Sequence, residues 1–165
     1  MSKIDGSKIR NVALLSHSGA GKTVITESAL VEAKMVSRFG TITDGNTVSD
    51  YEPEEHKRQA SVQTSIVSCV WNDHKINFID TPGFADYYGE VLSGVTAADI
   101  ALLTISAVAG IEVGTEQMWQ LVNKFNLATI IVVNKMDRDN INFVGLVEEL
   151  RNKFGRECVP IQIPV

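Results

Sequence analysis

Short runs of apolar residues alternate along this chain with stretches in which apolar residues recur at helical spacing. The apolar runs predict buried strands over residues 12–16, 64–71, 75–79, 100–105 and 129–133. Apolar residues three or four positions apart predict helices over residues 23–39, 85–97, 115–126 and 143–154. This alternation predicts an α/β fold of three layers, with helices packed on a mostly parallel sheet.

Three segments depart from this simple alternation. Residues 72–74 join two predicted strands, and so short a connection predicts an antiparallel pair. Residues 40–60 are polar and rich in turn-forming residues, so we predict no regular element there and expect the segment to be mobile without a bound ligand. Residues 159–165 have a strand-like pattern, although two prolines interrupt it.

Composition narrows the class of protein. The 165 residues can form one domain with its own core, and 44% hydrophobic with 21% charged residues is typical of soluble proteins, so we expect a cytoplasmic location. A net charge of −5 provides no basic surface for direct binding to DNA. No apolar run approaches the ~18 residues of a membrane span, and residues 1–10 lack the apolar stretch of a secretory signal. Cys69 and Cys158 match no metal-ligand spacing and are expected to be buried free thiols.

The chemistry of such a fold is expected in the loops that follow its strands, because ligands bind beyond the carboxyl ends of parallel strands. The first of these loops joins a predicted strand to a predicted helix. Its glycines allow successive N–H groups to face a phosphate, and the helix N-terminus adds partial positive charge. The pattern predicts a phosphate-binding loop that consists of His17, Ser18, Gly19, Ala20, Gly21, Lys22 and Thr23.

Two side chains of this loop have specific predicted roles. Lys22 is expected to bridge β- and γ-phosphate oxygens and to act in catalysis, and the Thr23 hydroxyl is expected to bind Mg²⁺. Ser16 stands where the phosphate-loop pattern normally begins with glycine; because this position is the entry to the loop, we expect serine to be tolerated. The alternative is a glycine-rich turn with an incidental lysine, and the strand–loop–helix context argues against it.

The second loop is Asp80-Thr81-Pro82-Gly83, directly after another predicted strand. An acid at a strand tip beside a phosphate loop can hold the Mg²⁺ shell, usually through water. The N–H of Gly83 can bind a γ-phosphate, and this residue is free to move when that phosphate leaves. Alone, these four residues could form a plain turn. Beside a phosphate loop they favour a metal and phosphate site.

The third loop, Asn134-Lys135-Met136-Asp137, is expected to select the base. The Asp137 carboxylate can accept hydrogen bonds from the N1–H and the 2-amino group of guanine. Adenine lacks that amino group, and an unpaired buried acceptor costs ~1–3 kcal/mol. Asn134 is expected to tie this loop to the phosphate loop, and the stem of Lys135 to cover the base. A polar surface turn is the alternative, which the order of the three loops disfavours.

These motifs, in this order and spacing, are those of the GTPase superfamily, and residues 9–164 resemble the start of the G domain of elongation factor G, the translocation GTPase of the ribosome. The details are more similar to a divergent paralogue than to the housekeeping factor. Besides the three loops, the resemblance rests on Asp44, Gly45, Asp50, Glu54, Arg58, Asp86, Arg138 and the run Pro160-Ile161-Gln162-Ile163-Pro164.

The resemblance implies a GTPase that binds GTP or GDP with Mg²⁺ and engages the ribosome as part of a longer protein. It implies that Thr23, Ser61 and Asp80 serve the metal ion. Ser61 stands where the family has threonine and keeps a hydroxyl. Phe84 stands at the position of the family's histidine, which is thought to orient the attacking water. We therefore expect slow hydrolysis by the isolated domain.

The family's fifth nucleotide-binding motif, a Ser-Ala pair whose backbone contacts the guanine oxygen, follows an inserted subdomain and is not found in this sequence. Ser106-Ala107 follows the fourth predicted strand and is not that motif. Residues 1–165 are therefore expected to form a partial, C-terminally truncated G domain that ends before the fifth motif. Two alternatives remain, namely a GTP-binding regulatory module that does not hydrolyse GTP, for which Phe84 argues, and an inert fragment.

Overall fold

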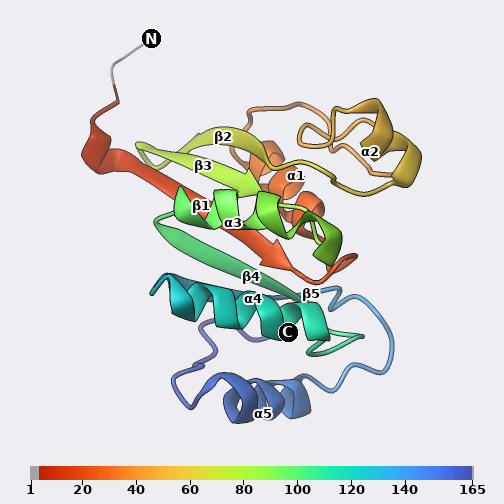
Figure 1. The fold of residues 1–165 in the computed structure, drawn as a ribbon, viewed down its shortest axis with the longest axis vertical. Helices are drawn as coiled ribbons and strands as arrows, with labels where there is room; N and C mark the ends of the chain where they lie inside the picture. The colour runs from red at the N-terminus through yellow and green to blue at the C-terminus, as the bar shows by residue number, and fades with distance from the viewer. Residues whose placement is uncertain (1–3, 165) are drawn as a thin grey trace.

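A five-stranded sheet forms the centre of the fold. The computed structural model describes residues 4–164, and Figure 1 shows the sheet with helices on both sides. The strands are β1 (Ile9–Ser16), β2 (Ser65–Trp71), β3 (His74–Asp80), β4 (Ile100–Ser106) and β5 (Ala128–Asn134), in the spatial order β2-β3-β1-β4-β5. The pair β2–β3 is antiparallel, and the other neighbouring pairs are parallel. The mostly parallel sheet predicted from the sequence is confirmed.

Helices cover both faces of this sheet. They are α1 (Lys22–Glu32), α2 (Pro53–Arg58), α3 (Tyr88–Thr96), α4 (Val113–Lys124) and α5 (Phe143–Phe154), with short 3₁₀ turns η1 (Gly6–Lys8) and η2 (Ala85–Tyr87). Leu30 of α1 packs in one cluster with Leu14. On the opposite face, α3 and α4 pack in one cluster with Leu15, and Leu146 of α5 packs with Ile105. The predicted three-layer fold is confirmed.

The direction of side chains along β1 explains this layering. Successive residues of a strand point to opposite faces of a sheet. Ala13 and Leu15 contribute to the core under α3 and α4, whereas Leu14 between them contributes to the core under α1. All three side chains are fully buried. A central strand that is covered on both faces needs apolar residues at consecutive positions, which is why β1 reads as a continuous apolar run.

The connection between β2 and β3 is as short as the sequence predicts. Asn72 and Asp73 both have positive φ angles, 46° and 61°. Two successive residues in the left-handed region are typical of the type I′ hairpin turn, whose twist matches that of the flanking strands. The antiparallel prediction for this pair is confirmed by the register from Ser65 opposite Asp80 to Trp71 opposite His74.

The first helix is shorter than predicted. It ends at Glu32 rather than near residue 39, and Lys34 adopts a left-handed conformation with φ 56°. The N–H of Met35 donates to the Leu30 carbonyl at 2.9 Å, a closure that ends helices and needs one left-handed residue. Val36, beyond this turn, packs against the core under α1. Its apolar contact continues the helical pattern although the helix has ended.

Residues 40–60 contain a helix that the sequence reading missed. α2 begins after Glu52, whose side chain and that of Glu55 form a capping box, with Pro53 at the first helical position. These are helix-start signals that are visible in the sequence. A six-residue helix is too short to show apolar periodicity, so the absence of a pattern gave the wrong prediction.

The predicted strand at the C-terminal end is also wrong within the described residues. Residues 159–164 form no regular element, and Ile161 and Ile163 are exposed. Pro160 and Pro164 cannot donate the backbone hydrogen bonds that a strand needs. Residue 165 lies outside the described residues. In the described part of the chain, no helix combines the length and the apolar character that a membrane span requires.

Candidate nucleotide site

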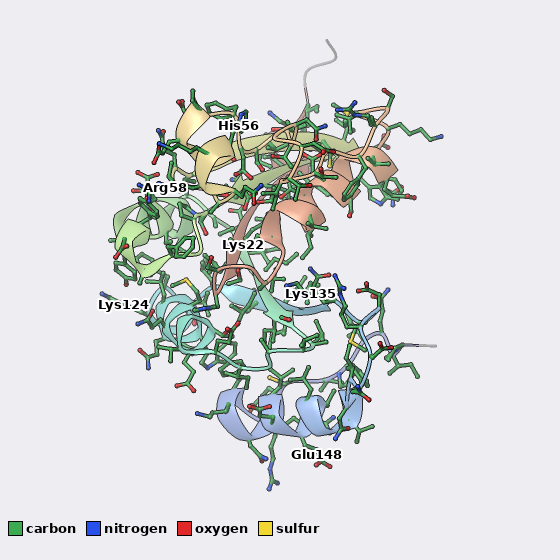
Figure 2. All side chains as sticks on the ribbon, turned by 90° about the vertical axis from the view of Figure 1, so that its right-hand side faces the viewer. Lys22, His56, Arg58, Lys124, Lys135 and Glu148 are labelled. Carbon is green, nitrogen blue, oxygen red and sulfur yellow. The ribbon has the colours of Figure 1, made fainter. Side chains whose placement is uncertain are left out.

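The three predicted loops meet at one edge of the sheet. β1, β3, β4 and β5 run in parallel, so their carboxyl ends point the same way. The loops after β1 and β5 lie near each other, and Figure 2 places Lys22 and Lys135 together at the centre of this edge, with His56 of α2 and Glu148 of α5 further away on either side. The topology therefore assembles residues from both halves of the sequence into one surface.

The phosphate loop has a backbone conformation that suits an anion-binding loop. Gly19 and Gly21 have φ angles of 78° and 104°, which other residues rarely adopt. Gly21 is the N-cap of α1, so the unpaired N–H groups of the first helical turn lie at the loop. A side-chain carbon on Gly21 would also collide with the Asn134 amide. Only glycine satisfies both requirements at this position.

Lys22 is a buried cation at the start of α1. The residue is 7% exposed, and its Nζ donates to Ser16 Oγ at 2.7 Å. Burial lowers the pKa of Lys22, and the negative charges of Asp80 and Asp50 oppose this change. Ser16, at the loop's entry, thus provides a hydrogen-bond acceptor for the lysine. This contact could not be read from the phosphate-loop pattern, which has no side chain at that position.

The loop after β5 holds the phosphate loop from the other side. Asn134 Nδ2 donates to the Ala20 carbonyl at 2.9 Å, and Lys135 Nζ donates to the Gly19 carbonyl at 2.7 Å. Lys135 has a φ of 61°, a strained value for a residue with a side chain. The expected hydrogen bond that links Asn134 to the phosphate loop is present in the structure. The role of Lys135 above a base stays a prediction.

Asp137 is exposed and makes little contact with the rest of the domain. Its side chain is 76% exposed, and among the described residues its charged partner is its neighbour Arg138, with Nε 3.7 Å from Oδ2. A carboxylate so weakly engaged can accept bonds from a base edge. The reading of guanine by Asp137 stays a prediction.

Asp80 is a buried acid without a hydrogen bond. It is 1% exposed, and neither carboxylate oxygen has a partner of ordinary hydrogen-bond length within the described residues. Burial raises the pKa of Asp80 to about 6, while the charge of Lys22 and the nearby hydroxyls of Ser49 and Thr23 act in the opposite direction. Unpaired buried oxygens of this kind are rare in proteins and call for a ligand.

Gly83 lies directly against the phosphate loop. A side-chain carbon at this position would be 2.8 Å from both Lys22 Nζ and Ser18 Cα. The loops after β1 and β3 are therefore in contact at Gly83. Its predicted bond to a γ-phosphate is compatible with this position and stays a prediction.

Ser61, the third predicted metal residue, is held by a different acid. Its hydroxyl donates to Asp50 Oδ1 at 2.6 Å. Thr47 Oγ1 lies 3.4 Å from the other oxygen of Asp50. Burial raises the pKa of Asp50, and the bond from Ser61 opposes that rise. Asp50 thus belongs to the site although sequence reasoning counted it only as a family match; a lone buried acid in a polar segment has no motif of its own.

His17, His56 and Phe84 each have different surroundings. His17 Nε2 lies 3.5 Å from Glu112 Oε1, ahead of α4. His56 Nε2 is 2.8 Å from the Asp50 carbonyl. Phe84 is 47% exposed at the start of η2 and is not packed into the core. None of these contacts assigns a residue that orients water.

The oxygens at this edge fit a hard divalent cation. Asp80 has two unpaired buried oxygens, and the hydroxyl of Thr23 lies close to it. Mg²⁺ prefers carboxylate and hydroxyl oxygens, keeps several waters and relies on phosphates for the rest of its shell. Among the described residues, no cluster of three or more His, Cys, Asp or Glu side chains could hold a metal alone. The site fits a metal ion that arrives with a phosphate ligand.

Comparison with known proteins decides the family. Residues 7–162 match the family described as Elongation factor Tu GTP binding domain. The chain belongs to this family. Membership in the Elongation factor Tu GTP binding domain family confirms the predicted GTP-binding domain, and the match extends over all three loops.

The chain is similar to several translation factors within this family. Ribosome-releasing factor 2, mitochondrial, of Candida dubliniensis is 38% identical over 164 residues, which cover 99% of this chain and 20% of that protein. Elongation factor G of Gluconobacter oxydans is 38% identical over 159 residues, which cover 96% of this chain and 23% of that protein. A crystal structure of a Thermus thermophilus protein matches with a TM-score of 0.87 and 37% identity. The match covers 91% of this chain and 23% of the chain in that structure. The predicted resemblance to elongation-factor-G-like GTPases is confirmed, and the chain spans about a fifth of its relatives' length.

Proposed function

We propose that this chain binds GTP or GDP together with Mg²⁺ and hydrolyses GTP slowly in isolation. In the longer parent protein, hydrolysis is coupled to engagement of the ribosome. The observation that carries the proposal is the pair of bonds from Asn134 and Lys135 to the phosphate loop. They join a base-reading loop to a phosphate-binding loop, and a guanine nucleotide needs both. In this proposal residues 1–165 act as a partial G domain without a fifth motif.

The proposed roles follow from the placement of each group. Lys22, at the base of the phosphate loop, neutralises phosphate charge, and the N–H groups at the start of α1 bind phosphate oxygens. Thr23, Asp80 and Ser61 hold Mg²⁺ and its waters, and Asp50 positions Ser61 by accepting a hydrogen bond from its hydroxyl. The metal ion, when bound, supplies positive charge to the β- and γ-phosphates. Asp137 accepts hydrogen bonds from the guanine edge.

Two measurements test the proposal. Calorimetry with GDP and GTP, with and without Mg²⁺, should show binding of guanine nucleotides and tighter GTP binding with the metal. Phosphate release is then followed with and without added ribosomes. Absence of guanine-nucleotide binding would contradict the proposal and favour an inert fragment. Binding together with ribosome-stimulated release would support it.

A second function, a GTP-binding module that does not hydrolyse, is favoured by one observation. Phe84 presents an apolar ring with no proton chemistry, and it is half exposed beside the loop after β3. His17 and His56 are engaged with Glu112 and with the Asp50 backbone. Tight binding without phosphate release, even when ribosomes are present, would favour this function over hydrolysis.

The ribosome as partner and the cytoplasm as location are parts of the same proposal. The relatives named ribosome-releasing factor 2 and elongation factor G support the ribosomal partner. Co-sedimentation of the chain with ribosomes in the presence of a slowly hydrolysed GTP analogue tests this part. Equal sedimentation with GDP and with the analogue would contradict nucleotide-dependent engagement.

A further inference from the structure

Glu27 is a fully buried acid on α1 that points at residues 40–48. The residue is 1% exposed. Its Oε2 accepts the N–H of Gly40 at 2.9 Å, and its Oε1 accepts the N–H of Val48 at 2.6 Å. Hydrogen bonds to an ionised acceptor are stronger than neutral ones. One carboxylate therefore holds both ends of the intervening loop.

The loop between these ends is closed by its own hydrogen bonds. The N–H of Thr41 donates to Asn46 Oδ1 at 2.7 Å, and the N–H of Gly45 donates to the Ile42 carbonyl at 3.1 Å. A side-chain carbon on Gly40 would be 2.7 Å from Glu27 Oε2, so glycine permits the close approach. Residues 40–48 thus form a compact unit that docks on α1 through Glu27.

Residues 40–48 lead directly, along the chain, to the metal side of the nucleotide site, which consists of Thr23, Asp50, Ser61 and Asp80. Ser49 and Asp50 follow Val48 in the chain and are 2% and 4% exposed. The charge of Asp50 opposes the lowering of the Lys22 pKa by burial, and it adds to the rise of the Asp80 pKa that burial causes. The Asp50 carboxylate accepts the hydroxyl of Ser61 at 2.6 Å and lies 3.4 Å from Thr47 Oγ1, and residues 40–48 precede it directly in the chain.

We propose that Glu27 is a positioning residue for the metal side of the site: it anchors residues 40–48 to α1 and thereby keeps Asp50 in its contact with Ser61. The helix that carries Glu27, α1, also begins at the phosphate loop. One helix therefore sets the positions of both the phosphate loop and the metal side. The consequence for Mg²⁺-dependent GTP binding rests on the proposed function. The anchor itself is a property of the protein without nucleotide.

The anchor is tested with Glu27→Gln, which keeps one carbonyl oxygen and turns an NH₂ group toward the second backbone donor. Glu32→Gln is the matched control, because Glu32 is on the same helix and exposed. Amide hydrogen exchange is followed by NMR on labelled protein without nucleotide. We expect exchange at Gly40 and Val48 to be at least about tenfold faster in Glu27→Gln, with unchanged exchange in β1.

The functional consequence has its own measurement. The Mg²⁺ concentration for half-maximal GTP binding should rise severalfold in Glu27→Gln, while GDP binding in a chelator stays as in the control. Glu27→Asp, which keeps the charge but is too short to reach both donors, should act in the same direction and serves if the glutamine variant does not fold.

Each contrary result has a definite meaning. Equal exchange at Gly40 and Val48 in Glu27→Gln and Glu32→Gln would overturn the anchor. Faster exchange with an unchanged Mg²⁺ requirement would overturn the positioning role. Failure of the unmodified protein to bind GTP would contradict the proposed function alone, because hydrogen exchange decides the anchor without nucleotide.

Discussion

The phosphate loop and residues 40–64 lie on two sides of the same site, but they are held by different means. The phosphate loop is held through its backbone carbonyls, which accept bonds from Asn134 and Lys135, and left-handed glycines permit its path. Residues 40–64 are held to the rest of the domain through backbone N–H groups that donate to Glu27 on α1 and Glu90 on α3. Within the segment, Glu55 on α2 accepts a further bond from the N–H of Val62.

This difference separates a preformed side from a releasable side. A loop whose left-handed turns are permitted by glycine and whose carbonyls are held by Asn134 and Lys135 keeps its shape without a ligand. A segment that is held by a few side-chain bonds can open locally without disturbing the core. The first arrangement suits tight phosphate binding, and the second suits a segment that responds to the loss of a phosphate. The following predictions test this contrast, beginning with the largest expected effect.

On the preformed side, Asp137→Asn should change the base that is bound. Loss of charge-assisted bonds to the N1–H and 2-amino groups should weaken GDP binding by at least about 100-fold, and xanthine nucleotides should gain affinity because an amide can donate to their 2-oxo group. Calorimetry with both nucleotides measures the change, with the exposed Asp139→Asn as control. Unchanged GDP affinity would rule out Asp137 as the base reader.

Asn134→Ala removes two side-chain hydrogen bonds from the preformed side, the one from Nδ2 to the Ala20 carbonyl and the one that Oδ1 accepts from the N–H of Lys135 at 2.8 Å. The Ala20 carbonyl would lose its partner, and a lost hydrogen bond of this kind costs about 1–3 kcal/mol, so GDP affinity should fall roughly tenfold. Asn152→Ala, on the exposed surface of α5, is the control. If GDP binds equally well to both variants, the phosphate loop does not depend on the loop after β5.

Asp80 sets a pH dependence where the two sides meet. Because burial raises its pKa from 3.8 to about 6, the folded protein takes up a proton before the unfolded chain does. Stability without ligand should therefore begin to rise as pH falls through about 6 and continue to rise toward pH 3.8, by at most on the order of 3 kcal/mol in total.

Asp80→Asn should remove most of this pH dependence and raise the melting temperature at pH 7 by a few degrees, while GTP binding loses its Mg²⁺ dependence. Thermal melts at several pH values, with and without Mg²⁺, measure both effects. A melting temperature that is lower in the variant at pH 7, with an unchanged response to Mg²⁺, would show that the buried charge is not the destabilising group.

Phe84, in the loop after β3 and outside both sides, should give the smallest effect in isolation. Because its ring is about half exposed, Phe84→His should leave the melting temperature within about a degree. Intrinsic GTP turnover should stay near background in both proteins, with single-turnover hydrolysis by Phe84→His rising only with ribosomes. Brisk turnover by the unmodified protein that His17→Ala abolishes would instead assign the role to His17.

Sequence patterns predicted the sheet and the phosphate loop because both depend on local features. A buried strand needs consecutive apolar residues, and the loop needs glycines next to Lys22 at fixed spacing. The end of α1 was misplaced because apolar Val36 packs on the core after the chain has turned at Lys34. Patterns record burial, and burial continues beyond the end of a helix.

The metal side was harder to predict for a different reason. The contacts of Glu27 and Asp50 join residues that are 21 and 11 positions apart, through loops without periodicity. Neither acid belongs to a motif, and an isolated glutamate in a helix usually faces solvent. Only the folded chain shows that both are buried. Ser61 was predicted to serve Mg²⁺, which stays a prediction, and its hydrogen-bond partner in the structure is Asp50.

The bond between Asn134 and Ala20 spans 114 residues of sequence, which has a consequence for the order of folding. The phosphate loop follows β1, yet it accepts hydrogen bonds from the loop after β5, a strand that is synthesised much later and must first pair with β4. Contacts of such long sequence separation form late, because chain closure has an entropic cost before it is rewarded. In a nascent chain the nucleotide site is therefore complete only after β5 has joined the sheet. Guanine nucleotides can bind, and thereby stabilise, only chains that have reached that stage.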